Sequence, residues 1–239
     1  MQQDFFPGNL IAEIGRFFVG APYKAGTLEA LGKEKLIVNL SGFDCTTFVE
    51  TVLALAECAI QGKITPAQFR KTLIFIRYRQ GTINGYSSRL HYFADWLRDN
   101  EKKKILKDIS RLFDAEAQRK KINYMTTHRE LYAALKNENE FQKMLVVEKN
   151  ISRKVFSVIG KDKINQHKTR IQNGDIIALT TNQEGLDVAH VGFACWQGKN
   201  LHLLHASNKE GCVTLSVKTL LTYLKSNKKF SGLIIARPI

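Results

Sequence analysis

The sequence predicts an α+β fold, and two observations on its 239 residues support this class. Apolar residues recur at helical spacing through much of the first two thirds of the chain, whereas the last third consists of short runs typical of strands. Helices followed by strands that can pair antiparallel form the α+β pattern. The chain is 44% hydrophobic, which is enough for a sizeable core, and no internal repeat or low-complexity linker divides it. We therefore expect a single domain over residues 1–239.

The predicted helices are justified by apolar periodicity and by their start signals. The clearest start is the stretch Thr65-Pro66-Ala67-Gln68, because Thr is a typical N-cap and Pro suits the first helical position. A run of unusual aromatic density follows in residues 89–97. Helices are expected at residues 11–19, 45–56, 66–78, 89–97 and 127–147, with a short strand at 35–40.

The predicted strands gather at the C-terminal end. A turn at residues 171–175 precedes the first of three runs that suit buried strands, and the second and third are joined through Gly198. A short helix is expected near residues 217–224. The expected strands are residues 151–159, 176–180, 188–196, 201–206, 213–217 and 233–237.

Composition limits the function. No apolar run is long enough to cross a membrane, and the first ten residues lack the pattern of a secretory signal, so a secreted form requires that the signal was removed. The four cysteines have no zinc-ligand spacing, and we expect neither a metal nor a cofactor. The formal net charge of +14 suits an anionic partner. The basic residues form no stripe with interleaved aromatics, so we expect no nucleic-acid partner.

The stretch Gly42-Phe43-Asp44-Cys45 contains the first candidate site residue. Asp44 is a plausible N-cap, which places Cys45 in the first turn of the helix that follows. Free backbone N–H groups and the positive end of the helix dipole favour a thiolate there, so Cys45 is a candidate nucleophile. The competing interpretation is a small apolar residue on the buried face of the helix.

Two of the six histidines are candidates because of strand pairing. A hairpin with an even loop centred on Gly198 and Lys199 places Gly192 opposite His205. Side chains alternate along a strand, so His190 shares a face with Gly192 and lies diagonal to His205. Gly192 has no side chain to separate the two imidazoles. The same alternation turns His202 to the other face.

A cysteine with two converging histidines makes a set of nucleophile, base and orienter. One imidazole accepts the thiol proton, and the second group fixes its tautomer. Such a set attacks a carbonyl and transfers an acyl group through a thioester, without a metal. We expect Cys45 as nucleophile, His190 as general base and His205 as orienter.

Three blocks resemble the NlpC-type cell-wall cysteine hydrolases, which are papain-like enzymes that cut amide bonds in peptidoglycan. They are Gly20-x-Pro22-Tyr23-x-x-Gly26, Asp44-Cys45-Thr46-Thr47-Phe48-Val49, and the strand residues Gly174-Asp175-Ile176, His190-Val191-Gly192 and His205-Ala206-Ser207. Two features depart from that pattern: Thr47 replaces the usual Gly, and 145 positions separate Cys45 from His190.

The departures resemble one branch, the N-acetylmuramoyl-L-alanine amidase-like family. The matching blocks are Ala25-Gly26-Thr27-Leu28-Glu29, Arg89-Leu90-His91-Tyr92-x-x-Asp95-Trp96, Thr126-Thr127-His128 and Leu186-Asp187-Val188-x-His190-Val191-Gly192. The resemblance implies a papain-like fold in which the nucleophile helix packs on a C-terminal antiparallel sheet, with a large helical insert at about residues 60–170. It also implies hydrolysis of the amide between the muramic acid lactyl group and L-alanine, on peptidoglycan or muropeptides in the periplasm or cell envelope.

The resemblance also marks substrate-binding candidates, each with a plainer alternative. Tyr23 would bound the cleft or simply pack in its loop, and Asp44 would face the substrate or act only as a cap. An Arg suits a peptide carboxylate, and a Trp stacks on sugars but is more often core. The candidates are Tyr23, Glu29, Asp44, Arg89, His91 and Trp96.

Two other functions stay open: a γ-D-glutamyl peptidase of the same superfamily, and a non-catalytic wall-binding module. The sequence leaves the oligomeric state open, with a monomer as the expectation.

Overall fold

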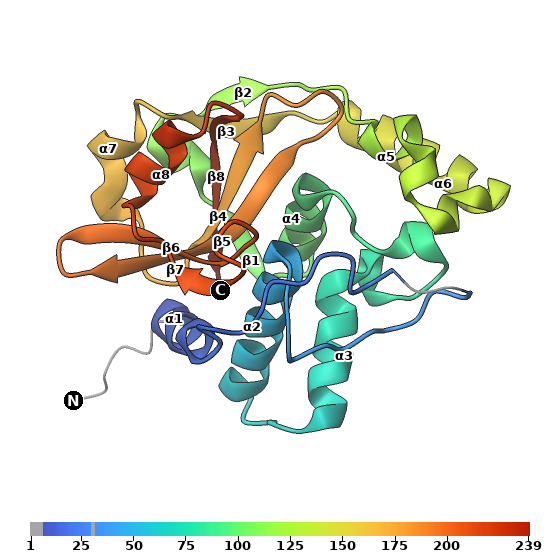
Figure 1. Cartoon of the computed structure of the whole chain (residues 1–239), viewed down its shortest axis with the longest axis horizontal. Coiled ribbons are helices and arrows are strands. Elements are labelled where there is room, and N and C mark those ends of the chain that lie inside the picture. Colours follow the sequence, from blue (N-terminus) through green and yellow to red (C-terminus); the bar gives the residue numbers. More distant parts are fainter. Residues whose placement is uncertain (1–6, 30–31) are drawn as a thin grey trace.

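The computed structural model describes residues 7–29 and 32–239, and it confirms the α+β class. One antiparallel sheet runs in the order β2-β3-β8-β4-β5-β6-β7, and β1 also pairs with β8 (Figure 1). The strands are β1 (Leu106–Asp108), β2 (Glu116–Gln118), β3 (Phe156–Gly160), β4 (Ile176–Thr181), β5 (Val188–Gln197), β6 (Asn200–Ser207), β7 (Cys212–Leu215) and β8 (Phe230–Pro238).

The helices α1, α2 and α3 lie below the sheet in Figure 1, and α5 and α6 lie together to its right. The α-helices are α1 (Pro7–Phe17), α2 (Cys45–Ile60), α3 (Pro66–Arg77), α4 (Phe93–Lys102), α5 (Tyr124–Thr127), α6 (Glu138–Ser152), α7 (Ile164–His167) and α8 (Leu220–Ser226). Short 3-10 turns lie at Arg79–Gly81, Tyr86–Ser88, Ser110–Phe113, Arg129–Leu131, Ala133–Lys136 and Lys168–Arg170. Within the described ranges, no helix has the length and hydropathy to span a membrane.

Both faces of the central strands are covered, and alternation along β4 shows how. Ile176 and Ala178 pack in the core shared with α1 and α2, whereas Ile177 and Leu179 pack in the core shared with α8. All six residues of β4 are therefore buried, which explains its continuous apolar run. The α2 side includes Phe48 of the helix against Phe193 of β5, with ring centroids 5.8 Å apart. This packing fixes the start of α2 against β5.

Several predicted boundaries are wrong for identifiable reasons. Residues 35–40 are extended but pair with no strand among the described residues. The helix expected at 89–97 begins at Phe93, because Arg89 is held in extended backbone by its pairing with Tyr78. The helix expected at 127–147 is broken into short turns, and α6 continues to Ser152, where a strand was expected.

The expectation of a helical insert at about residues 60–170 needs correction. Three strands of this segment, β1, β2 and β3, join the main sheet through β8. The helices α3 and α4 of this segment pack in the core shared with α2, and the part around α5 and α6 forms a small apolar core of its own. Its buried members are Tyr86, Tyr92, Ile122, Met125, Leu135, Met144 and Ile151.

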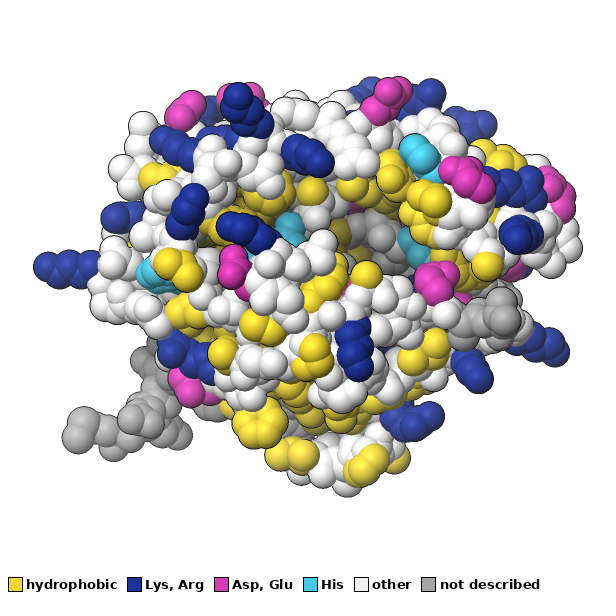
Figure 2. Space-filling view, in the orientation of Figure 1, with side chains coloured by type: hydrophobic (Ala, Val, Ile, Leu, Met, Phe, Trp, Pro, Cys, Tyr) yellow, Lys and Arg dark blue, Asp and Glu magenta, His cyan; other side chains and the backbone are white. Residues whose placement is uncertain are grey.

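The face drawn in Figure 2 is hollowed at its centre, and histidine side chains are visible inside the hollow. The start of α2 and the strands β5 and β6 meet in this region of the molecule.

Candidate active site

Cys45 is the first residue of α2, as its sequence context predicts. Asp44 caps the helix: its Oδ1 accepts a hydrogen bond from the Thr47 backbone N–H at 2.7 Å. Thr47 returns the contact, because its Oγ1 accepts from the Asp44 backbone N–H at 3.0 Å. This reciprocal capping box gives Thr47 a structural role that a glycine at this position would not have. It also commits the Asp44 carboxylate to the helix end.

Tyr23 lies beside this helix start because its loop is hydrogen-bonded on two sides. The Phe43 N–H donates to Pro22 O at 3.0 Å, and the Tyr23 N–H donates to Gly211 O at 2.8 Å. Burial raises the pKa of Tyr23 to about 12, and negative charge at Cys45 and Asp44 acts in the same direction. Tyr23 therefore keeps its hydroxyl proton at neutral pH and can donate a hydrogen bond.

The β5–β6 hairpin has the register predicted from the sequence. Phe193 pairs with Leu204 and Gln197 with Asn200, so Gly192 stands opposite His205. A Cβ atom on Gly192 would come within 2.8 Å of the His205 Cβ. The bare glycine leaves room for the imidazoles to meet: His190 Nε2 and His205 Nδ1 lie 2.6 Å apart, with the rings nearly perpendicular at 84°.

His202 lies on the opposite face of β6 and takes no part in this pair. Its Nδ1 is 2.8 Å from the Ser216 carbonyl oxygen, and its side chain is buried. Its role in the described structure is to hold the segment after β7.

Cys45 lies against β5, the strand that carries His190. Its thiol is within hydrogen-bonding reach of the Val191 backbone N–H, and Val191 follows His190 on β5. Burial raises the pKa of Cys45 to about 11, with the Asp44 charge acting in the same direction; hydrogen bonds from Val191 and Thr46 oppose the shift. The expected thiolate preference at a helix start is thus outweighed by burial.

The two imidazoles are neutral at physiological pH. Burial, followed by the neighbouring His205, lowers the pKa of His190 to about 3. Burial also lowers the pKa of His205 to about 4. A neutral imidazole has a free lone pair, so His190 can accept the thiol proton as the sulfur attacks.

Tyr223 of α8 completes this region, although the sequence analysis did not single it out. Its ring centroid lies 5.4 Å from that of His205 and 6.4 Å from that of His190. Burial raises its pKa, and charge at Cys45 and Glu210 acts in the same direction. No local pattern in residues 217–224 marks this tyrosine, because its position depends on how α8 folds over the sheet.

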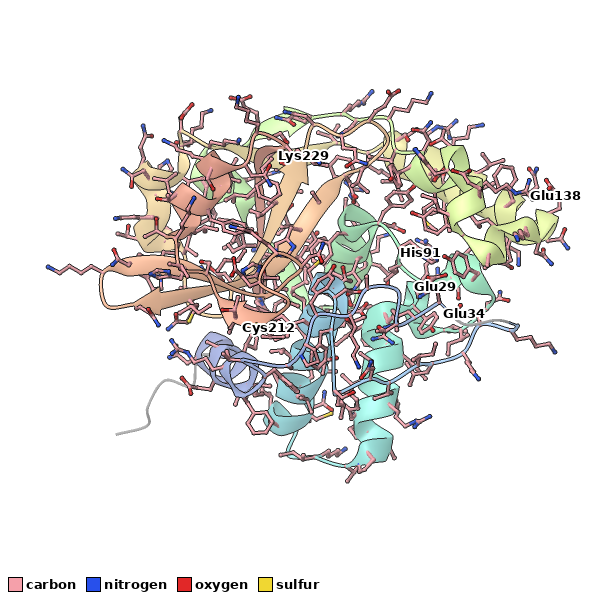
Figure 3. The ribbon with its side chains drawn as sticks, viewed as in Figure 1. Glu29, Glu34, His91, Glu138, Cys212 and Lys229 are labelled. Carbon is pink, nitrogen blue, oxygen red and sulfur yellow. The ribbon has the colours of Figure 1, made fainter. Side chains whose placement is uncertain are left out.

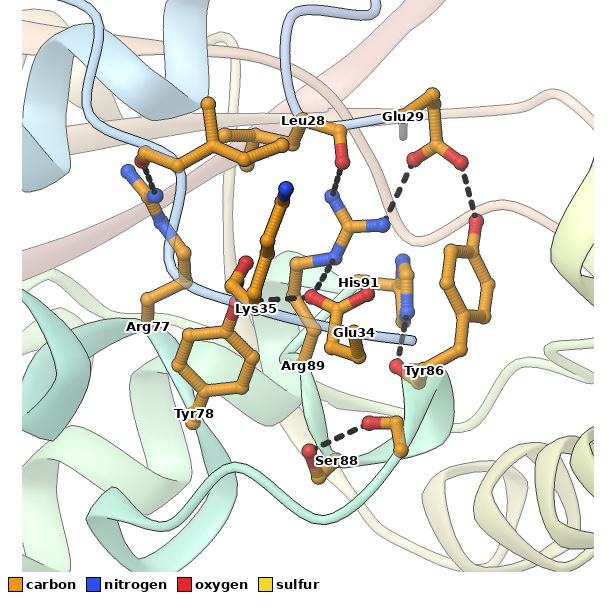
Figure 4. A network of polar contacts seen from close by, with 12 residues as sticks. Leu28, Glu29, Glu34, Lys35, Arg77, Tyr78, Tyr86, Ser88, Arg89 and His91 are labelled. Atoms are coloured by element: carbon orange, nitrogen blue, oxygen red, sulfur yellow. Dashed lines mark hydrogen bonds and ion pairs between the residues drawn. The ribbon is translucent and has the colours of Figure 1, made fainter. Parts of the chain in front are cut away.

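Glu29, Arg89 and His91 belong to one polar network at some distance along the chain from the cysteine (Figures 3 and 4). Arg89 Nη2 donates to Glu29 Oε1 at 2.8 Å, and Arg89 Nε lies 3.4 Å from Glu34 Oε1. Burial disfavours the charge of Arg89, but the carboxylates of Glu34 and Glu29 outweigh it and raise its pKa. The guanidinium is 5% exposed, so it is largely occupied by these protein carboxylates.

His91 sits at the edge of the same network. Its Nε2 is 2.9 Å from the Tyr86 carbonyl oxygen, and its ring packs on the Tyr86 ring with centroids 4.3 Å apart. Burial and the nearby Arg89 charge lower the pKa of His91 well below its usual value, so the ring is neutral. Figure 3 shows Glu29, Glu34 and His91 grouped together. Of the three, Glu29 is the most exposed, with 44% of its side chain accessible.

Trp96 does not fit a role in sugar stacking, and that interpretation is wrong. The side chain is fully buried, stacks on Phe93 with ring centroids 4.8 Å apart, and donates from Nε1 to Glu50 Oε1 at 3.2 Å. Glu50 of α2 also accepts from Arg77 Nε of α3 at 2.6 Å. These two buried contacts of Glu50 join α2 to α3 and α4, and so hold the helix that begins at Cys45 in place.

Among residues 7–29 and 32–239, no group of three or more His, Cys, Asp or Glu side chains is placed to hold a metal ion. The four cysteines are all free thiols.

Comparisons with known proteins agree with this architecture. The chain belongs to the N-acetylmuramoyl-L-alanine amidase-like family, whose model matches residues 13–233. A solved N-acetylmuramoyl-L-alanine amidase from Bacteroides uniformis is 38% identical, with a TM-score of 0.92 over 98% of this chain and 99% of that one. A structure described as a putative xylanase from Bacteroides fragilis is 44% identical, with a TM-score of 0.89 over 94% and 99%.

A protein from Legionella pneumophila is more distant, at 25% identity and a TM-score of 0.74 over 98% of this chain and 90% of that one. No match was found among curated protein sequences.

Proposed function

We propose that this chain is a papain-like cysteine amidase that cleaves the amide between the N-acetylmuramic acid lactyl group and L-alanine in peptidoglycan fragments. The observation that carries the proposal is the contact of His190 with His205 at 2.6 Å, beside a helix that begins at Cys45. Membership of an amidase-like family supports the choice of an amide substrate. The similarity to the solved N-acetylmuramoyl-L-alanine amidase from Bacteroides uniformis supports the choice of this particular amide bond.

The proposed reaction uses each member of the set once. His190 accepts the Cys45 proton as the sulfur attacks the lactyl carbonyl, and His205 holds the ring of His190 in place. The backbone N–H groups at the start of α2 face the developing negative charge. The amine leaves with the proton from His190, and water then hydrolyses the thioester. In this proposal Tyr23 borders the cleft, and the Glu29–Arg89–His91 network shapes a more distant wall.

A glycoside hydrolase is less compatible with the observed carboxylates. Such enzymes place a pair of free carboxyl groups on either side of the scissile bond. Glu29 and Glu34 share the guanidinium of Arg89, and each accepts a tyrosine hydroxyl, from Tyr86 at 3.0 Å and from Tyr78 at 2.8 Å. Both carboxylates are therefore already engaged by protein groups.

Mass spectrometry of digested muropeptides tests the proposal. The expected products are a free muramic acid sugar and an intact peptide that begins with L-alanine. A muramoyl dipeptide, with L-alanyl-D-glutamate still attached to the sugar, together with a freed peptide that begins with the diamino acid, would instead establish the γ-D-glutamyl peptidase. No cleavage by the intact protein would favour a wall-binding module. Activity that survives EDTA and is lost on thiol alkylation would support the cysteine mechanism; zinc-restored activity would contradict it. Action in the periplasm or cell envelope is part of the proposal, because the substrate occurs there.

A further inference from the structure

A groove of about 620 Å³ opens on the β6–β7 side of the histidine pair, and we call it the α8 groove. Its wall includes His205 and Tyr223, so it begins at the pair itself. Beyond them it is lined by the turn that joins β6 to β7, by β7, and by the ends of α8.

The α8 groove carries an excess of positive charge. Three lysines line it, Lys209, Lys218 and Lys228, against one carboxylate, Glu210. Lys209 lies 3.8 Å from Glu210, but Lys218 and Lys228 form no ion pair with any described residue. Figure 2 shows Lys and Arg side chains around the central hollow of this face. Two exposed ammonium groups beside a groove favour an anionic ligand.

The chemistry of acyl transfer indicates which part of the substrate lies here. The sulfur of Cys45 forms a bond to the carbonyl carbon, and the carbon–nitrogen bond then breaks. The leaving nitrogen takes the proton that His190 accepted from the thiol, so this nitrogen must lie beside His190. His205 occupies Nε2 of His190, so the transferred proton passes through Nδ1, on the other side of the ring. Tyr223 connects this side to the groove: its ring centroid lies 6.4 Å from that of His190, burial and then charge at Cys45 raise its pKa, and it lines the α8 groove. A peptide on the leaving nitrogen can therefore reach the groove past Tyr223, while the acyl group stays on the sulfur.

We propose that the α8 groove is the binding site for the leaving peptide, and that its ligand is an acidic peptide whose carboxylates pair with Lys218 and Lys228. The inference rests on the proposed function, which makes the leaving group a peptide that begins with L-alanine and continues with an acidic residue. Tyr223 forms the wall between this peptide and the imidazoles. Its raised pKa keeps the phenol protonated, so it can donate to a peptide carbonyl or carboxylate.

The test compares two double variants of the full chain. Lys218→Ala with Lys228→Ala removes both unpaired charges of the groove. Lys63→Ala with Lys71→Ala is the matched control, because it removes two exposed lysines from a different groove, beside the start of α3. The probes are L-alanyl-D-glutamate and its diamide, and binding is measured by calorimetry at low and at moderate salt.

We expect the wild type and the control to bind the dipeptide about tenfold more tightly than the diamide, with the preference weakened by salt. The groove variant should lose this preference, and its KM for a muropeptide should rise about tenfold with little change in kcat. Equal binding of dipeptide and diamide by the wild type, or an equal loss in the control, would overturn the proposal.

The binding measurement needs no turnover, so it separates this inference from the proposed function. Dipeptide preference in a chain that releases no L-alanyl peptide would support the groove and reject the amidase. Release of the peptide with an unchanged KM in the groove variant would reject only the groove.

Discussion

Gly192→Ala tests whether the bare strand position is what lets the two imidazoles meet. The new Cβ would lie 2.7 Å from Leu204 O and 2.8 Å from the His205 Cβ. Ordinary van der Waals contact begins at 3.4 Å, so His205 has to move by about 0.6 Å. The backbone oxygen belongs to a paired strand and yields little, so the imidazole of His205 takes most of the shift. Overpacking of this kind costs about 1–3 kcal/mol of stability.

The activity should fall further than the stability suggests. The nitrogens of His190 and His205 are 2.6 Å apart, and moving one ring weakens the contact that orients the other. Because misplacement of catalytic groups by ~1 Å can cost about 100-fold, we expect kcat/KM on a muropeptide to drop about 10- to 100-fold. Urea unfolding measures the stability in parallel.

Gly198→Ala is the matched control at the tip of the same hairpin. Its φ of +56° makes alanine strained there, but no atom lies within 4 Å of the added Cβ. It should lose about 1 kcal/mol of stability and keep its activity. If Gly192→Ala kept kcat/KM within twofold of wild type, the argument that this glycine admits the imidazole pair would be refuted.

The remaining predictions concern the candidate set itself. Cys45→Ala should reduce hydrolysis by several orders of magnitude while circular dichroism and Tm stay close to wild type; a tenth of the wild-type kcat would remove it from the mechanism. Because burial lowers the pKa of His190 to about 3, proton uptake should inhibit only far below neutrality, so kcat/KM should be flat between pH 5 and 8; an acid limb near pH 6.5 would contradict this burial effect. His205→Gln should retain measurable activity and His205→Ala less, as steady-state kinetics would show; equal rates would argue against an orienting role. His202→Ala should keep its activity but lose about 1–2 kcal/mol in urea unfolding, because the Ser216 carbonyl loses its partner.

The β5–β6 hairpin could be predicted because its register depends on local information alone. Strand alternation and an even loop at Gly198 are enough to place Gly192 opposite His205. The start of α2 was equally accessible, since an N-cap candidate and a first-turn cysteine are adjacent in sequence. The raised pKa of Cys45 could not be predicted, because burial by segments distant in sequence outweighs the effect of the helix N-terminus, which favours the thiolate.

Other features escaped prediction because their causes are long-range. Trp96 falls on the apolar face of its helix in either case, whether the side chain packs in a core or faces a ligand. Its burial and its contact with Glu50 in the structure show that it packs in the core. Strands β1 and β2 are three residues each within a charged segment, and they exist because β8 and β3 pair with them. Tyr223 reaches the histidines only through the placement of α8.

The position of β8 in the sheet has a consequence for how the protein is made. β8 is the last strand of the described chain, yet it lies between β3 and β4 and also pairs with β1. Cys45 therefore leaves the ribosome long before the strand that joins the two parts of the sheet around it. The nascent chain cannot close its sheet until residues 230–238 have been made, and such long-range pairing folds slowly. Loss of residues 230–238 would deprive three strands, β1, β3 and β4, of their partner, so a truncated product should be prone to aggregation and to proteolysis.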